Sequence, residues 1–360
     1  MRPRIHDRYL LRQFSRILLY SILAFTVIYV TVDVFEEIDN FIDHEAKLHH
    51  IALYYLYSIP FILTYIIPVS LMLGTVFAMG IMARRNELTA LIASGVSLAR
   101  IATPVILTSV LISCFSAYFN DVIVAKANRH KDDIMRYEIE RQPRGNPEVI
   151  ENFHYLGEAG FLYLARSFNH VDGMLYGVVV QQFAEHTLLR RIDAERATWK
   201  NGVWVFTGGY VRTFDGGGER VEAFTEMRMP EIRETPEDFE AEEIEVENMN
   251  FLELKRYAEK VRRTGGRTEK YLVDLWFKLS FPFAGSIFVL IGVAFASGKR
   301  KQSIATGFGL TLVISFMYYA LLRVGQTLGH NGVLPPLLAA QLGNVIFLVL
   351  GVALMWRANR

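Results

Sequence analysis

Cysteine is almost absent from this sequence, because Cys114 is the single one among 360 residues. A lone thiol excludes an intramolecular disulfide, so the fold must be stabilised by other interactions. Cys114 lies within a long apolar run, and we expect it to act as a small buried hydrophobe instead of a reactive thiol.

Charged side chains are missing from six long stretches, although the chain carries 38 Lys and Arg and 37 Asp and Glu. The stretches are 17–32, 51–83, 101–120, 279–298, 302–322 and 324–356. A helix needs about 20 apolar residues to cross a bilayer. We therefore predict six transmembrane helices, three on each side of a charged middle region. A signal peptide is the alternative for the first stretch, but no small-residue cleavage site follows it, which favours an uncleaved span.

Lys and Arg are scarce in the short loops on one side of these predicted spans. That side has only Lys47 and Arg323. The other side has Arg2, Arg4, Arg8, Arg12, Arg16, Arg84, Arg85, Arg100, Lys299, Arg300, Lys301, Arg357 and Arg360. Because positively charged loops stay in the cytoplasm, this bias predicts that both termini are cytoplasmic and that the middle region is extracytoplasmic.

The middle region, bounded at 126–268 between membrane parts at 1–125 and 269–360, carries strand patterns. FLYLARSF, YGVVVQQF and ATWKNGVWVFTGGYVRTF are β-branched and aromatic runs, and Asn201-Gly202 is a hairpin signal. These runs predict an all-β, jellyroll-like domain with helical connectors on both sides. The acidic segment 231–247 is expected to be an exposed connector. The predicted fold class is a membrane α-helical bundle of six transmembrane helices (3+3) with this inserted extracytoplasmic domain.

A short polar-edged segment, ARRNELTALIASGVSLAR at 83–100, separates the second and third stretches. Asn86 can cap a helix, Glu87 favours the helix dipole in its first turn, and Gly95 offers a stop. The apolar side chains of this helix fall on one face: Leu88, Leu91 and Ile92. A helix over 86–94 is too short to be stable alone, so we expect it to dock with these apolar residues as its buried face.

Motifs for catalysis are missing or incomplete. The run from Gly292 to Arg300 resembles a Walker A loop, but it has five residues between its glycines and no Ser or Thr after the lysine. HEAKLHH at 44–50 is one residue too long for a zinc-protease motif, and solvated histidines explain it more simply. The sequence has no Gly-x-Ser-x-Gly element. We therefore expect a protein that is not an enzyme and that binds no cofactor or metal itself.

Five local patterns resemble a known family when they are taken together. They are DRYLLRQF at 7–14, RRNELTALIASGVS at 84–97, ATWKNGVWVFTGGYV at 197–211, KLSFPFAG at 278–285 and LGHNGVLPPLLAAQLGN at 328–344. Their order and spacing along nearly the whole chain resemble the LptF/LptG (YjgP/YjgQ) family of lipopolysaccharide export permeases. The DRYLLRQF start and the VDVFEEIDNF segment lean toward the LptG type.

The resemblance implies an ABC transporter permease subunit in the inner membrane of a Gram-negative bacterium. It would extract lipopolysaccharide from the outer leaflet and pass it to a periplasmic bridge. The implied partners are a cytoplasmic LptB-like ATPase dimer that uses ATP and Mg, a second LptF-like or LptG-like permease, an LptC/LptA-like bridge protein, lipopolysaccharide and membrane lipid, but no nucleic acid. The helix at 86–94 becomes the coupling helix, with Glu87 as its polar contact to the ATPase. Arg84 and Arg85 either assist this contact or serve only as positive-inside anchors.

The resemblance also implies lateral gates between the first and fifth spans of paired permeases. In this chain it points to Phe25, Tyr29, Phe316 and Tyr319, although lipid-facing aromatic residues look the same in sequence. Arg323 could bind a lipid phosphate bidentately, or it could pair with Asp33 or Glu36. Two other functions fit the same pattern: a permease or mechanotransmitter for another lipid or a protein, and a non-transporting membrane assembly scaffold.

Overall fold

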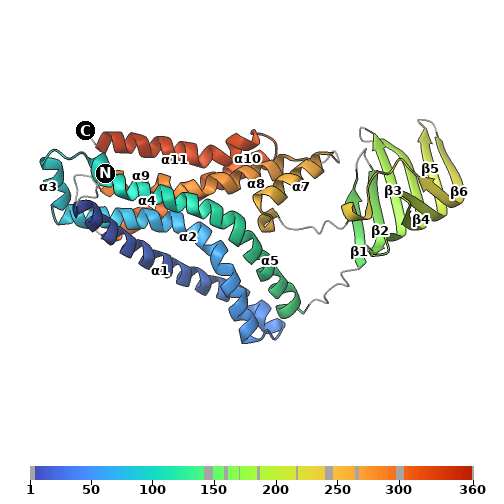
Figure 1. The fold of residues 1–360 in the computed structure, drawn as a ribbon, viewed down its shortest axis with the longest axis horizontal. Coiled ribbons are helices and arrows are strands. Elements are labelled where there is room, and N and C mark those ends of the chain that lie inside the picture. The colour runs from blue at the N-terminus through green and yellow to red at the C-terminus, as the bar shows by residue number, and fades with distance from the viewer. Residues whose placement is uncertain are drawn as a thin grey trace. The chain divides into compact units, whose positions relative to one another are not determined.

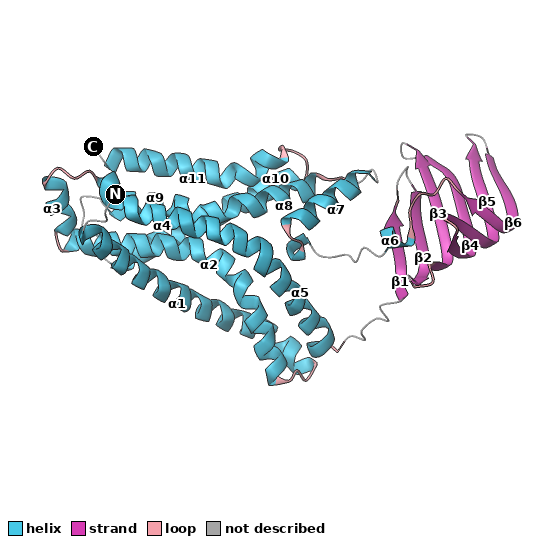
Figure 2. Cartoon of the chain, viewed as in Figure 1, coloured by secondary structure: helices cyan, strands magenta, loops and turns pink. Residues whose placement is uncertain are grey.

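The computed structural model describes residues 5–141, 149–157, 161–169, 171–184, 187–215, 218–239, 246–263, 267–296 and 304–358. The chain separates into two compact units, one built of helices and one of β-strands (Figure 2). The helical unit contains Met1–Arg141, Val246–Lys255 and Glu269–Arg360, and the β unit contains Gln142–Glu245 and Arg256–Thr268. The charged helical extension near residues 126–140 belongs to the helical unit, because it continues the third span directly.

Six helical segments of the described chain are long and apolar enough to cross a membrane, so the predicted fold class is confirmed. The elements of the helical unit are α1 (Ile5–Asp43), α2 (Leu48–Arg84), α3 (Glu87–Ala93), α4 (Leu98–Phe119), α5 (Ala125–Asp133), α8 (Glu269–Ser280), α9 (Ala284–Ala296), α10 (Ile304–His330) and α11 (Pro336–Ala358), with α7 (Phe251–Arg263) shared between the units. Two π-helical segments, Asn120–Val124 and Ile134–Ile139, flank α5. Figure 1 shows α3 at the end of the bundle where α1 starts and α11 ends.

Helices α2 and α9 form the centre of the bundle, and small residues allow them to approach closely. A Cβ atom at Gly292 would lie 3.3 Å from Thr75, and one at Gly285 would lie 2.5 Å from a methyl group of Leu71. Gly292 therefore serves helix packing within a span, which agrees with rejecting the Walker A reading.

The fourth span is interrupted where Pro282 lies in a short 3₁₀ turn, Phe281–Phe283, between α8 and α9. Asn344 of α11 donates a hydrogen bond of 2.8 Å to the carbonyl of Ser280, and the Tyr318 hydroxyl donates one of 2.7 Å to Asn344. In the membrane a neighbouring helix must satisfy backbone groups that a proline frees. The buried Asn344 thus stabilises the break from the adjacent span.

Surface positions correct one expectation about the spans. Cys114 of α4 is exposed on the helical unit, so its interpretation as a buried hydrophobe is wrong. The apolar part of α1 is also exposed, because only 6% of its most apolar 18-residue stretch is buried. A helix that exposes so much apolar surface needs lipid or another protein around it.

The β unit is built from one six-stranded antiparallel sheet within the described residues. Its strands are β1 (Val149–Leu156), β2 (Phe161–Asn169), β3 (Met174–Ala184), β4 (Thr187–Lys200), β5 (Val203–Asp215) and β6 (Gly218–Met229), in the order β1-β2-β3-β4-β5-β6. Each strand pairs with its neighbour in sequence, so the observed order is a meander. The predicted hairpin joins β4 to β5, and Asn201 and Gly202 both have positive φ, at 52° and 78°, as a type I′ turn requires.

One face of the sheet packs into an aromatic core that includes Trp204, Tyr163 and Phe168. Phe239, at the end of the short helix α6 (Pro236–Phe239), packs against this core and is 2% exposed. The expectation of an exposed connector is therefore wrong for the described part of 231–247, because Ile232, Glu234 and Phe239 are buried. Acidic composition concealed the apolar side chains that anchor this segment to the sheet.

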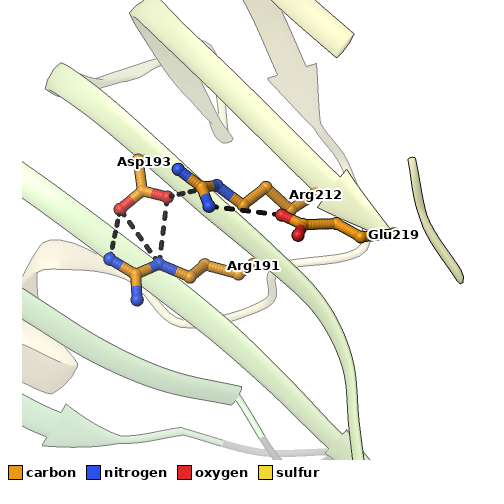
Figure 3. A network of polar contacts seen from close by, with 4 residues as sticks. All are labelled: Arg191, Asp193, Arg212 and Glu219. Atoms are coloured by element: carbon orange, nitrogen blue, oxygen red, sulfur yellow. Dashed lines mark hydrogen bonds and ion pairs between the residues drawn. The ribbon is translucent and has the colours of Figure 1, made fainter. Parts of the chain in front are cut away.

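The other face of the sheet carries charged side chains, which Figure 3 shows at close range. Arg191 and Arg212 stand opposite each other in the β4–β5 register, where like charges repel. Asp193 lies between them, 2.6 Å from Arg191 and 3.7 Å from Arg212, and Glu219 accepts a hydrogen bond of 3.2 Å from Arg212. The hydrogen bonds that the Arg191 guanidinium donates to Asp193 raise the pKa of Arg191. This network compensates the repulsion at the surface.

Candidate functional site

The candidate coupling segment is a short helix held between two sharp turns. Helix α2 ends at Arg84, and Asn86 adopts the left-handed conformation, with φ of 60° and no capping hydrogen bond from its side chain. Asn86 therefore supplies a turn and not the predicted side-chain cap. At the other end Gly95 has φ of +86°, and the amide of Val96 donates to the carbonyl of Leu91, so the predicted stop is confirmed.

Helix α3 presents one face to its own bundle and another to the outside. Leu88 is 3% exposed and belongs to an apolar cluster with Leu10 of α1 and Leu98 of α4. Leu91 packs partly buried against the same cluster. Ile92, in contrast, is 45% exposed, so it does not share the buried face that its spacing predicts. Ile92 lies about 40° around the helix from Leu88 but one turn further along it, so its exposure shows that the packing beneath α3 does not extend as far as Ile92.

Glu87 is engaged within the chain and lies at the junction of α1, α2 and α3. The hydroxyl of Tyr9 donates to Glu87 Oε1 at 3.3 Å, and Arg85 lies 3.9 Å from the same oxygen. Arg85 also donates to the Tyr9 hydroxyl at 3.1 Å. The second oxygen of Glu87 is buried and has no hydrogen-bond partner among the residues that the structure describes. Arg84, the last residue of α2, is exposed.

Asp7 and Arg100 form a second polar contact beside α3. Arg100 donates two hydrogen bonds to the carboxylate of Asp7, of 3.4 and 3.2 Å, and His6 lies 3.1 Å from that carboxylate. The sequence analysis assigned no role to Asp7 or Tyr9. Asp7, Leu10 and Phe14 lie on one helical face and all are buried, so an acid on the apolar stripe of an Arg-rich helix was the available signal.

The expected cavity residues lie on α1 and α10, and α2 contacts both groups. On α1, Phe25 is half-buried, Tyr29 is 40% exposed, and Asp33 accepts a hydrogen bond of 3.0 Å from Tyr55 of α2. On α10, the hydroxyl of Tyr319 donates to the carbonyl of Tyr65 of α2 at 2.7 Å.

The remaining two cavity residues lie at the surface of α10. Phe316 is 73% exposed, as a residue facing lipid or a partner would be. Arg323 is exposed and donates to Gln326 at 3.3 Å, which is neither of the acidic partners considered from the sequence. Its guanidinium therefore stays accessible to an anion.

The histidines at the turn between α1 and α2 and at the start of α2 have protein contacts of their own. His44 is hydrogen-bonded to the carbonyl of Asn40 at 3.0 Å, and His50 lies 3.5 Å from Glu138. Among the described residues, no group of three or more His, Cys, Asp or Glu side chains is arranged to hold a metal ion.

A family model described as lipopolysaccharide export system permease LptF/LptG matches residues 8–357 of this chain. The chain belongs to the LptF/LptG family. It is similar to the lipopolysaccharide export system permease protein LptG of Escherichia coli K12, with 20% identity over 319 residues that cover 86% of each protein. The LptG protein of Escherichia coli O6:H1 strain CFT073 gives the same identity and coverage.

Family membership makes this LptF/LptG protein a lipopolysaccharide export permease, and thus a transport subunit and not an enzyme. Its six membrane-spanning helices agree with a place in the inner membrane.

Proposed function

We propose that this chain is the membrane subunit of an ABC transporter in which a separate cytoplasmic LptB-like ATPase dimer binds α3. The ATPase uses ATP and Mg, and its closure moves α3 and drives lipopolysaccharide from the outer leaflet of the inner membrane toward a periplasmic bridge. A second LptF-like or LptG-like permease completes the cavity. The termini and α3 are cytoplasmic, the β unit is periplasmic, and an LptC/LptA-like protein receives the lipid.

The observation that carries this proposal is the two-sided construction of α3. Leu88 fixes the helix to its own bundle, whereas Ile92 leaves an aliphatic side chain exposed at the helix surface. An exposed apolar anchor beside a partly exposed carboxylate, Glu87, suits a protein groove better than water. The basic residues Arg84, Arg85 and Arg100 support the cytoplasmic location through the positive-inside bias.

The substrate path is proposed along α1 and α10. Phe25, Tyr29 and Phe316 provide apolar surface for acyl chains, and Arg323 provides a guanidinium for a lipid phosphate. Tyr319 and Asp33 act in this proposal by holding α10 and α1 against α2. The LptG type is favoured by the start of the sequence and by the LptG names of the two Escherichia coli relatives.

The proposal is tested by purifying the full chain with its co-expressed permease and ATPase and by measuring ATP-dependent lipid release from proteoliposomes. We expect the soluble ATPase to copurify and lipopolysaccharide to be released. Glu87→Lys should weaken ATPase association. The matched control Glu36→Lys should not, because Glu36 lies near the C-terminal end of α1, and Glu87 contacts the N-terminal end of that helix. If no ATPase copurifies, the chain is a scaffold. If the released lipid or protein is a different cargo, the substrate assignment is wrong.

A further inference from the structure

Helix α1 is deeply buried at its first turns and largely exposed along its apolar middle. Near its far end it is held again, because Phe41 is buried and Asp33 accepts a hydrogen bond from Tyr55 of α2. Its first three turns bury Asp7, Leu10 and Phe14, which are 5%, 1% and 0% exposed. In the most apolar 18-residue stretch of the same helix, only 6% is buried. A rigid helix that is fixed at one end transmits a displacement of that end to its whole length.

The fixed end of α1 contacts the elements on both sides of α3. Tyr9 is hydrogen-bonded to Glu87, the first residue of α3, and to Arg85, which precedes it. Asp7 is hydrogen-bonded to Arg100 in the first turn of α4, which follows α3. The apolar cluster beneath contains residues from all of these helices: Leu10, Phe14, Met82, Leu88, Leu98 and Ile101. A movement of α3 therefore reaches α1 through contacts on both sides.

The ion pair is the more rigid of the two polar contacts. The Asp7 side chain is 7% exposed and that of Arg100 is 28% exposed. Separating the pair would leave a buried carboxylate without its countercharge, which is costly even where the intact pair adds little net stability. Two hydrogen bonds from one planar guanidinium also fix orientation, which a single ammonium contact would not do. Asp7 and Arg100 are thus suited to fixing the geometry between α1 and α4.

We propose that Asp7 and Arg100 are positioning residues that transmit the displacement of α3 to α1, with the Tyr9–Glu87 contact as a second link. This inference rests on the proposed function, in which the ATPase moves α3. It assigns α1 the role of a lever: its cytoplasmic end follows the coupling helix, its far end stays in contact with α2 through Asp33, and its exposed apolar middle changes position against lipid. The two residues act through α1 and do not touch the transported lipid.

The test follows the position of α1 in the complete transporter with ATPase, reconstituted in nanodiscs. Spin labels are placed at Ile28 of α1 and Val349 of α11, both more than half exposed, in a Cys114→Ser background. Pulsed electron paramagnetic resonance compares the distance between the labels in the nucleotide-free and vanadate-trapped states. We expect trapping to shift this distance in the unmodified chain.

Asp7→Asn should reduce the shift by more than half while ATPase copurification and hydrolysis stay within twofold. A purely structural role would destabilise the protein but leave the shift of the folded molecules unchanged, and that result would overturn the inference. Arg8→Gln, an exposed position in the same turn, is the matched control and should retain the full shift. If Asp7→Asn does not insert, Arg100→Lys should also reduce the shift, and a full shift in that variant overturns the inference equally. Failure of the ATPase to bind contradicts the proposed function itself, whereas an ATPase that binds and hydrolyses ATP without moving the labels in the unmodified chain overturns the inference.

Discussion

Asp7 of α1 and Arg100 of α4 are joined by two hydrogen bonds, of 3.4 and 3.2 Å, although 93 positions separate them in the sequence. The two ions are not equally shielded, because the side chain of Asp7 is 7% exposed and that of Arg100 is 28% exposed. Removing Arg100 takes the guanidinium away from the more buried of the two charges, the carboxylate of Asp7. Removing the charge of Asp7 instead leaves a guanidinium that water can reach.

The first prediction follows from this asymmetry. Arg100→Gln should lower the free energy of unfolding by about 3 kcal/mol, because it removes the positively charged guanidinium that donates two hydrogen bonds to a buried carboxylate. Asp7→Asn should cost about 1 kcal/mol, since the amide still accepts a hydrogen bond and the exposed part of Arg100 is hydrated. Unfolding of the purified chain in detergent by denaturant measures both. Equal costs for the two variants would contradict the assigned burial of the pair.

Buried Leu88 and exposed Ile92 of α3 should separate folding from association. Leu88→Ala removes a buried side chain and should cost about 3 kcal/mol of stability. Ile92→Asp should leave stability within about 0.5 kcal/mol and weaken ATPase binding at least tenfold, or about 1.4 kcal/mol. Unfolding and titration of the ATPase onto the purified permease are measured on the same two preparations. An Ile92→Asp protein that binds the ATPase normally would remove Ile92 from the interface.

Sequence patterns predicted most of the fold because the signals are long and repetitive. Charge-free runs determine spans, alternation determines strands, and Asn201-Gly202 determines a hairpin, so these elements were found. Such patterns describe one segment at a time, so they do not predict a contact between residues that are far apart in the sequence. The sequence did not show that Asp7 pairs with Arg100. Spacing assigned Ile92 to the buried face of α3, but it did not show that the packing beneath this short helix ends before Ile92.

The segment after β6 gives the same lesson and a third prediction. Its acidic composition concealed Phe239, whose ring centroid lies 5.1 Å from that of Phe153 and 5.2 Å from that of Tyr163. Phe239→Ala should destabilise the β unit by about 3 to 5 kcal/mol by leaving a cavity in the aromatic core. Hydrogen exchange of β-strand amides in the full chain measures this loss. The control Leu189→Ala, at a position 40% exposed, should leave exchange nearly unchanged.

Alkaline pH should destabilise the β unit through Tyr163. Burial, followed by the nearby carboxylate of Glu234, raises the pKa of Tyr163, whose hydroxyl donates to that carboxylate at 2.9 Å. Above about pH 10 the unfolded chain loses the phenolic proton and the folded chain keeps it. The folded state then binds more protons, so its stability falls as pH rises, by at most about 1.4 kcal/mol per unit.

Tyr163→Phe should abolish this contribution, and Tyr210→Phe, at a position 54% exposed on the same unit, should retain it. Hydrogen exchange of the β unit between pH 9 and pH 11, corrected for intrinsic rates, gives the slope for each variant. Identical slopes in the Tyr163→Phe and unmodified proteins would show that another group controls the alkaline response.

The central claim is that this permease moves lipopolysaccharide along α1 and α10 when its partner ATPase hydrolyses ATP. Photo-crosslinking residues at positions 25, 29 and 316, in the assembled and hydrolytically active complex, test it most directly. We predict lipopolysaccharide adducts at these positions whose yield changes on addition of ATP, with no such change when a hydrolysis-deficient ATPase is used. An active complex that gives no lipopolysaccharide adduct at any of the three positions would contradict the account.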